Sequence, residues 1–266
     1  MKRLSVGMAL LTAGLLGLSA LPLAAAAPGS TMQDANGQPD SWSFDVVPYL
    51  WIATYGGTFD LPGAPVGIGQ TKSASSDPFS THISAAAMLM GEVRYKDVGL
   101  FLDGAWLQLK TEGNASSDLY SGVDIKSSIG FGTMALTYRL PPMGKLKTDL
   151  LAGARIWHVS TTMDFEAGTA PAFSTDASKT WYDPIVGAHL RYDFTPHWYA
   201  VALGDAGGFG VGSDLEWNVF GGVGYQFTSW FSTTLGYRYM HMNYDKDQFL
   251  MNVGVQGFLL GVGFHF

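Results

Sequence analysis

Residues 181–194, WYDPIVGAHLRYDF, alternate between apolar and polar side chains. The even positions, from Tyr182 to Tyr192, are almost all apolar, whereas the odd positions include Asp183, His189 and Arg191. Successive side chains of a strand point to opposite faces, so one face is apolar and the other polar. Ten residues separate the two tyrosines, about 33 Å of strand, which a tilt near 40° projects to about 25 Å. That height matches the apolar band of a membrane-spanning barrel.

The same alternation recurs along the chain. A soluble β-sandwich would carry many Lys and Glu on its exposed face, whereas here the polar faces hold Gly, Asn, Arg and Asp. The pattern predicts ten strands, an even number that returns the C-terminus to the side where the chain began. The expected strands are residues 43–55, 83–95, 98–112, 123–140, 146–163, 181–194, 198–207, 215–227, 231–244 and 248–266.

Composition excludes several other classes. The chain has 266 residues, a net charge of −7, 14% charged residues, 34 Gly and no Cys, whereas ordinary soluble domains have about 25% charged residues and about 7% Gly. Beyond residue 27 no apolar run approaches the roughly 18 residues of a spanning helix. The acidic balance argues against nucleic acid as a partner, and the lack of Cys excludes disulfides and thiolate chemistry. We therefore predict an all-β, antiparallel up-and-down transmembrane β-barrel.

The N-terminus has the features of an export signal. Lys2 and Arg3 precede an apolar run over residues 4–23, and Ala24-Ala25-Ala26 offers the small residues that signal peptidase reads. Cleavage is predicted after Ala26, the alternative being an uncleaved anchor helix. The expected organisation is a signal peptide (1–26), a flexible periplasmic segment (27–42) and a barrel (43–266), located in the outer membrane of a Gram-negative bacterium.

The lengths of the connections predict the orientation. Short turns at 96–97, 141–145, 195–197 and 228–229 are assigned to the periplasm, and longer segments at 56–82, 113–122, 164–180 and 208–214 to the outside. The short connection at 245–247 departs from this trend. Aromatic rings favour the membrane–water boundary, and the predicted interface aromatics are Tyr95, Tyr138, Tyr182, Tyr192, Trp217, Tyr225, Phe264 and Phe266.

Charged residues of the strands fall on the inward parity. A charge facing mid-membrane lipid would cost about 2–4 kcal/mol, and Arg pairs with carboxylates bidentately. The sequence does not decide which face of its strand Asp205 lies on. An inward Asp205 puts Tyr199 and Leu203 inward as well, unless a bulge at Gly204 resets the register. Neither His189 nor His265 belongs to a metal-ligand motif, so no metal or cofactor is predicted. The expected lumen residues are Glu92, Arg94, Asp103, Arg139, Asp149, Arg155, Asp183, His189, Arg191, Asp193, Asp205, Glu216 and Arg238.

The C-terminus resembles the signal by which the outer-membrane assembly machinery recognises its substrates. The chain ends on Phe266, with Leu260, Val262 and Phe264 on the same face, whereas Leu259 departs from that pattern. Other phrases resemble a widespread group of exported Gram-negative barrel proteins, and this resemblance implies the fold and location but no activity. The partners implied are the assembly machinery, outer-membrane lipids and lipopolysaccharide. The phrases are PYLW (48–51), LAGARIW (151–157), DPIVGA (183–188), GDAGGFGVGSD (204–214) and LGYRY (235–239).

Three functions fit this interpretation, and the favoured function is not enzymatic. The first is a barrel with a narrow or closed lumen that passes small solutes or none and has a structural role. The second is a surface binding or adhesion module that acts through segments 56–82 and 164–180. The third is a lipid A-modifying enzyme, because His158 and Ser160 share an outward face and are similar to the deacylase arrangement, although Thr161 stands where those enzymes commonly have Asn. An omptin-type protease would use rim residues such as His241, Asp164, Asp245 and Asp247.

Overall fold

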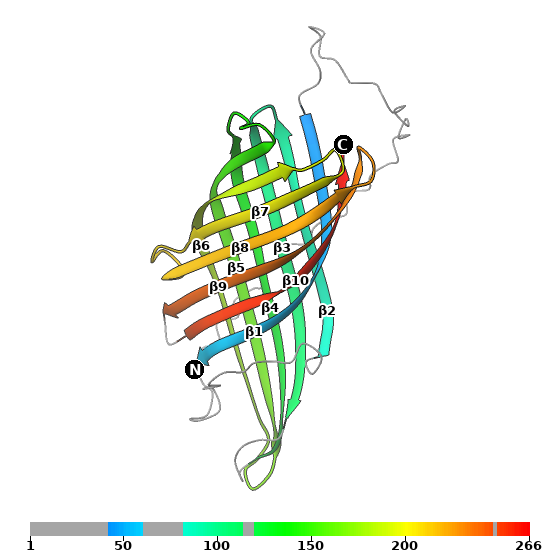
Figure 1. The fold of residues 1–266 in the computed structure, drawn as a ribbon. Helices are drawn as coiled ribbons and strands as arrows, with labels where there is room; N and C mark the ends of the chain where they lie inside the picture. Colours follow the sequence, from blue (N-terminus) through cyan, green and yellow to red (C-terminus); the bar gives the residue numbers. More distant parts are fainter. Residues whose placement is uncertain (1–41, 61–81, 114–119, 247–248) are drawn as a thin grey trace, which may run out of the picture. The chain divides into compact units, whose positions relative to one another are not determined.

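The described part of the computed structural model, residues 42–60, 82–113, 120–246 and 249–266, is a closed antiparallel barrel of ten strands (Figure 1). Each strand pairs with the next in the chain, and β1 closes the barrel by pairing with β10. The predicted fold class is therefore confirmed. The strands are β1 (Trp42–Asp60), β2 (His82–Tyr95), β3 (Val98–Gly113), β4 (Tyr120–Arg139), β5 (Leu146–Ala167), β6 (Phe173–Asp193), β7 (Trp198–Gly207), β8 (Leu215–Gln226), β9 (Phe231–Lys246) and β10 (Phe249–His265).

The start of β1 and the end of β10 lie side by side at one end of the barrel, as an even strand number requires. The backbones of Phe44 and Phe266 exchange hydrogen bonds of 3.0 and 2.9 Å there. The predicted signal peptide and the segment up to residue 41 lie outside the described residues, and Trp42 already belongs to β1. No helix among the described residues is long and apolar enough to cross a membrane.

The predicted outer connection at 164–180 is wrong. β5 and β6 are 22 and 21 residues long, and they pair continuously up to Phe165 and Phe173, which leaves residues 168–172 as the connection. A membrane crossing needs only about 9–11 residues, and β7 and β8 have 10 and 12. The β5–β6 hairpin therefore runs far beyond the ends of β7 and β8, which Figure 1 shows at its lower end.

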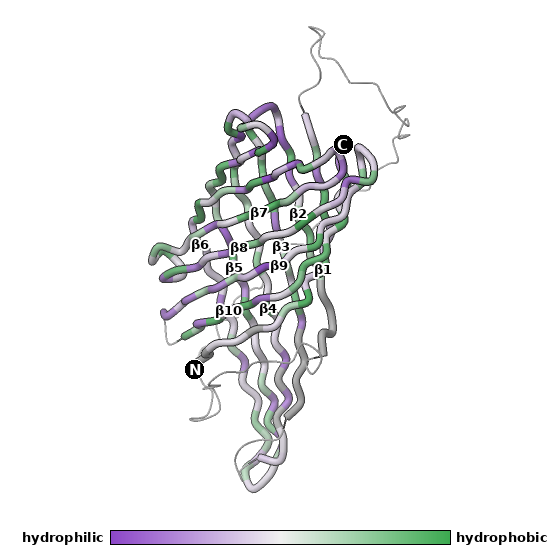
Figure 2. Tube along the Cα trace, in the orientation of Figure 1, coloured by the Kyte–Doolittle hydropathy of each residue, from purple (hydrophilic) through white to green (hydrophobic). Residues whose placement is uncertain are grey.

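Hydrophobic side chains cover the outside of the barrel. Exposed large residues include Ile52, Leu136, Val186, Leu235 and Phe258, which come from five different strands. Figure 2 shows hydrophobic and hydrophilic positions interspersed along the strands. Successive side chains of a strand point to opposite faces, so the residues between the exposed apolar positions point inward. An apolar outer band on a closed sheet is the surface that a lipid bilayer covers.

The seam between β1 and β10 contains a close backbone approach. Gly257 lies opposite Ala53, and a Cβ added to Gly257 would lie 2.0 Å from the carbonyl oxygen of Ile52. The absence of a side chain at this position is therefore a packing requirement of the closed barrel.

Candidate functional site

An ion layer fills the middle of the barrel, and its first half centres on Arg238. Nη2 of Arg238 donates to Asp103 Oδ2 at 2.6 Å, Nε donates to Asn218 Oδ1 at 2.9 Å, and Nη1 lies 3.3 Å from the hydroxyl oxygen of Tyr49. Tyr49 itself donates to Asp103 Oδ1 at 2.8 Å. Only 1% of the surface of Arg238 is exposed, so this ion pair is desolvated.

The second half of the ion layer centres on Arg155, which is also 1% exposed. Its Nη1 lies 3.0 Å from Asp205 Oδ1 and 3.3 Å from Glu216 Oε1, and its Nε donates to Thr133 at 2.9 Å. Asn218 donates to Asp205 at 2.7 Å and accepts from Arg238, so it joins the two halves. The ion layer is thus one connected network across the lumen.

Another buried carboxylate, that of Asp183, fastens the connection between β7 and β8. Asp183 accepts hydrogen bonds from the backbone N–H and the hydroxyl of Ser213, each at 2.6 Å, and the indole of Trp181 donates to the same hydroxyl at 2.9 Å. The Lys246 ammonium group also donates to the carbonyl of Gly210 at 2.8 Å. These bonds hold residues 208–214 against the neighbouring strands.

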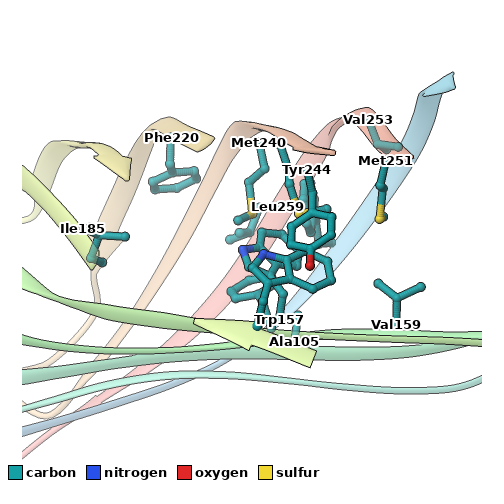
Figure 3. Packing of buried hydrophobic residues seen from close by; sticks show 14 of the residues in the cluster. Ala105, Trp157, Val159, Ile185, Phe220, Met240, Tyr244, Met251, Val253 and Leu259 are labelled. Carbon is teal, nitrogen blue, oxygen red and sulfur yellow. The ribbon is translucent and has the colours of Figure 1, made fainter. Parts of the chain in front are cut away.

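Aromatic side chains close the barrel on the side of the ion layer away from the short turns. Trp157 and Trp181 stack with ring centroids 6.3 Å apart, and Trp181 contacts Tyr244 at 4.4 Å, which in turn meets Phe249 at 5.9 Å. Figure 3 shows Trp157 and Tyr244 pointing toward one another from opposite walls, with Met240 and Leu259 beside them. These rings are almost fully buried, so the lumen holds a packed core rather than a channel.

A vestibule opens on the other side of the ion layer, at the end where the short turns lie. Its volume is about 200 Å³, and its inner wall is largely apolar, with Met90, Phe101, Leu203, Phe220 and Leu259. Ion pairs surround it near the rim, Arg94 with Glu92 at 2.5 Å, Arg139 with Asp149 at 2.8 Å, and Arg191 with Asp193 at 2.9 Å. The cavity therefore has an apolar depth and a charged mouth.

The residues predicted for the lumen all lie on the inward parity. Asp205 is inward together with Tyr199 and Leu203, and the pairing of β7 with both neighbours is regular through Gly204, so no bulge resets the register. The ion layer and its neighbours hold Asp103, Asp183, Asp205, Glu216, Arg155 and Arg238. The vestibule region holds Glu92, Arg94, Arg139, Asp149, His189, Arg191 and Asp193.

The predicted interface aromatics lie on the outward parity. Tyr182 is 63% exposed at the end of the apolar band away from the short turns, and Trp217 stacks on Tyr239 with centroids 4.7 Å apart. At the opposite end lie Tyr95, Tyr138, Tyr192, Tyr225, Phe264 and Phe266, together with Trp42, Phe194, Trp198, Phe227 and Trp230.

Beyond Tyr182 the outward face of β4, β5 and β6 becomes polar, and we call this surface the projecting sheet. It carries Lys126, His158, Ser160, Thr162, Asp164, Glu166, Ser174, Asp176, Ser178 and Thr180. Asp164 accepts from Ser174 at 2.7 Å and from Lys126 at 3.3 Å, and these two bonds hold its pKa below the ordinary value. Because this face lies outside the apolar band, water and the lipid headgroup region surround it.

The histidines of the two enzyme alternatives, His158 for a lipid A deacylase and His241 for an omptin-type protease, both lie on the outward face. Nδ1 of His158 lies 2.7 Å from the Thr180 hydroxyl on the neighbouring strand. His241 faces outward beside Trp217 on β9, while Asp164 is on the projecting sheet, and Asp247 is outside the described residues. Within the described ranges, no group of three or more His, Asp or Glu side chains could hold a metal ion.

The closed even-stranded sheet, the exposed apolar band and the two aromatic belts define an outer-membrane β-barrel protein. No protein-family model and no curated protein matches the sequence. Among solved structures, the fold is similar to the outer membrane protease OmpT from Escherichia coli, with 10% identity, 86% of this chain and 97% of that chain covered, and a TM-score of 0.45. It is also similar to Ail, the attachment invasion locus protein of Yersinia pestis, with 16% identity, 85% of this chain and 99% of that chain covered, and a TM-score of 0.34. A major outer membrane protein from Thermus thermophilus is similar with 11% identity, 85% of this chain and 100% of that chain covered, and a TM-score of 0.38.

Proposed function

We propose that this outer-membrane barrel does not conduct solutes and that its projecting sheet binds the saccharide part of lipopolysaccharide. The observation that carries the proposal is the continuation of β5 and β6 past the apolar band, with Ser, Thr, His and carboxylate side chains on the outer face. At that height the sheet stands in the saccharide layer of the outer leaflet. The packed lumen favours this function over a pore.

The chemistry of the face supports saccharide over protein as the partner. Hydroxyl, imidazole and carboxylate groups exchange hydrogen bonds with sugar hydroxyls. Protein–protein hot spots are instead enriched in Trp, Tyr and Arg, and the outward positions of β5 and β6 beyond Tyr182 hold none of these three.

A binding measurement with matched variants tests the proposal. The refolded protein in phospholipid vesicles is titrated with lipopolysaccharide core oligosaccharide, and a triple variant, Ser160→Ala, Ser178→Ala and Thr180→Ala, is compared with Thr233→Ala. Thr233 is an outward-parity hydroxyl at the opposite end of the barrel. Each lost hydrogen bond removes about 0.5–1.5 kcal/mol, so we expect the triple variant to bind at least about tenfold more weakly and the control to bind unchanged. Equal affinity of the three proteins, or no binding by the wild type, would refute the proposal.

A further inference from the structure

Three polar residues at the vestibule mouth form a hydrogen-bonded chain. The hydroxyl oxygen of Ser232 lies 2.8 Å from Nε2 of His265, and Nδ1 of the same imidazole lies 2.5 Å from Oδ1 of Asp45. Both ring nitrogens are thus engaged, one by a hydroxyl and one by a carboxylate. These three residues are separate from the ion layer and from the projecting sheet.

Barrel closure creates this arrangement. Ser232 is on β9, His265 is near the end of β10 and Asp45 is near the start of β1. Asp45 lies directly opposite His265 across the seam, whereas Ser232 lies opposite Gly263 and reaches His265 diagonally. A Cβ on Gly263 would lie 2.5 Å from the Ser232 hydroxyl oxygen and 3.1 Å from His265 Nε2. The bare glycine therefore leaves the space in which hydroxyl and imidazole meet.

We propose that Ser232, His265 and Asp45 form the nucleophile, general base and orienting acid of a serine ester hydrolase that faces the periplasm. The order of contacts is the one this chemistry requires, because the carboxylate must accept Nδ1–H so that Nε2 can accept the hydroxyl proton. A hydrogen-bonded hydroxyl or a His–Asp pair alone would be an ordinary structural feature. The complete Ser–His–Asp chain with the correct nitrogen at each end is a reactive arrangement.

The vestibule indicates the class of substrate. Ser232, His265 and Asp45 all line this cavity of about 200 Å³, whose apolar inner wall suits the acyl chain of a short carboxylic ester. The side chains of His265 and Asp45 are 25% and 37% exposed, so water reaches the mouth. Arg191 is a cation of the same cavity, with its guanidinium 3.7 Å from the centre of the Tyr199 ring. The strand amides are used in the barrel ladder, so a side-chain donor such as Arg191 must stabilise the oxyanion.

The reaction balances without a cofactor. The Ser232 oxygen attacks the ester carbonyl carbon as its proton moves to His265 Nε2, and the carbonyl oxygen becomes an oxyanion. Collapse of this intermediate breaks the ester C–O bond, and His265 returns the proton to the leaving alcohol, which leaves an acyl group on Ser232. Water, deprotonated by His265, then attacks the acyl carbon, releases the carboxylic acid and regenerates the serine hydroxyl.

The test is covalent labelling and ester hydrolysis by the refolded barrel, with folding checked by the heat-dependent shift of its gel mobility. The probes are a small fluorophosphonate and p-nitrophenyl butyrate, and the variants are Ser232→Ala, Asp45→Asn and Gly263→Ala. Ser127→Ala is the matched control, because it deletes a serine hydroxyl that lies 3.2 Å from the Thr161 hydroxyl in another part of the barrel.

We expect wild type and Ser127→Ala to be labelled and active. Ser232→Ala should lose the label, and both Ser232→Ala and Asp45→Asn should lose activity by about 100-fold or more. Gly263→Ala, which keeps all three side chains but displaces them, should lose activity as well. The proposal is overturned if the folded wild type is neither labelled nor active, or if Ser232→Ala keeps its activity. The three residues would then only connect β1, β9 and β10 by hydrogen bonds.

Discussion

Replacement of Arg238 by Met is the perturbation whose cost follows most directly from the structure. Met fills a similar volume but removes the cation that Asp103 faces at 2.6 Å and the donor that Asn218 faces at 2.9 Å. Asp103 would keep the Tyr49 hydroxyl at 2.8 Å and would otherwise be a buried, unpaired carboxylate. Breaking one side of a buried ion pair costs about 3–5 kcal/mol, so Arg238→Met should lower the free energy of unfolding by that amount.

The assay is urea unfolding of the protein in phospholipid vesicles, followed by tryptophan fluorescence. Lys147→Met is the control, because the Lys147 side chain is 47% exposed beside Asp193 and such a pair contributes about 0–1 kcal/mol. The double variant Arg238→Met with Asp103→Leu removes both charges and should recover most of the lost stability. A cost for Arg238→Met no larger than that for Lys147→Met would refute the assignment of the ion layer as a desolvated network.

Further predictions concern the lipid face, the seam and the projecting sheet. Val186→Arg, at a position that is 53% exposed and lies between the belt residues Tyr182 and Tyr192 on β6, should cost about 2–4 kcal/mol in the same unfolding assay, and no cost would place this residue away from lipid. Gly257→Ala should prevent closure of β1 on β10 and lower the refolding yield, because the added carbon meets a backbone oxygen 2.0 Å away; a normal yield would contradict the seam register. Carboxyl NMR should show a pKa for Asp164 below its ordinary value. The favourable contribution of Asp164 to folding should be lost as pH falls through that lowered pKa. Ser174→Ala removes the main cause and should raise this pKa; an unchanged value would contradict the bond.

Most of the fold could be predicted from sequence because one physical constraint acts on every strand. Lipid excludes charge from one face, so the parity of residues such as Asp183 and Tyr182 is visible in the alternation alone. The β5–β6 extension could not be predicted this way. On β6 before Tyr182, the outward positions from Ser174 to Thr180 are polar, and the inward positions Thr175, Ala177 and Lys179 carry no large apolar side chain. This stretch therefore has the composition of a loop.

The candidate sites were predictable to different degrees. Inward parity predicted which residues line the lumen, but not that Asn218 joins Arg238 to Asp205, because such links depend on side-chain placement across the barrel. The Ser232–His265–Asp45 chain was missed for a similar reason. Asp45 and His265 are 220 residues apart in sequence, and only closure of the barrel makes them neighbours. The direct signals were an inward His near the C-terminus and Gly263 beside it.

Side chains fill the lumen of this barrel, with the ion layer in the middle and aromatic side chains beyond it. Ion conductance of the refolded protein in planar bilayers tests this most directly, with insertion verified in the same sample. We expect no discrete conductance steps from the wild type, because Arg155 and Arg238 are each 1% exposed and pair with carboxylates inside the lumen. Reproducible steps from folded, inserted protein would contradict a filled lumen.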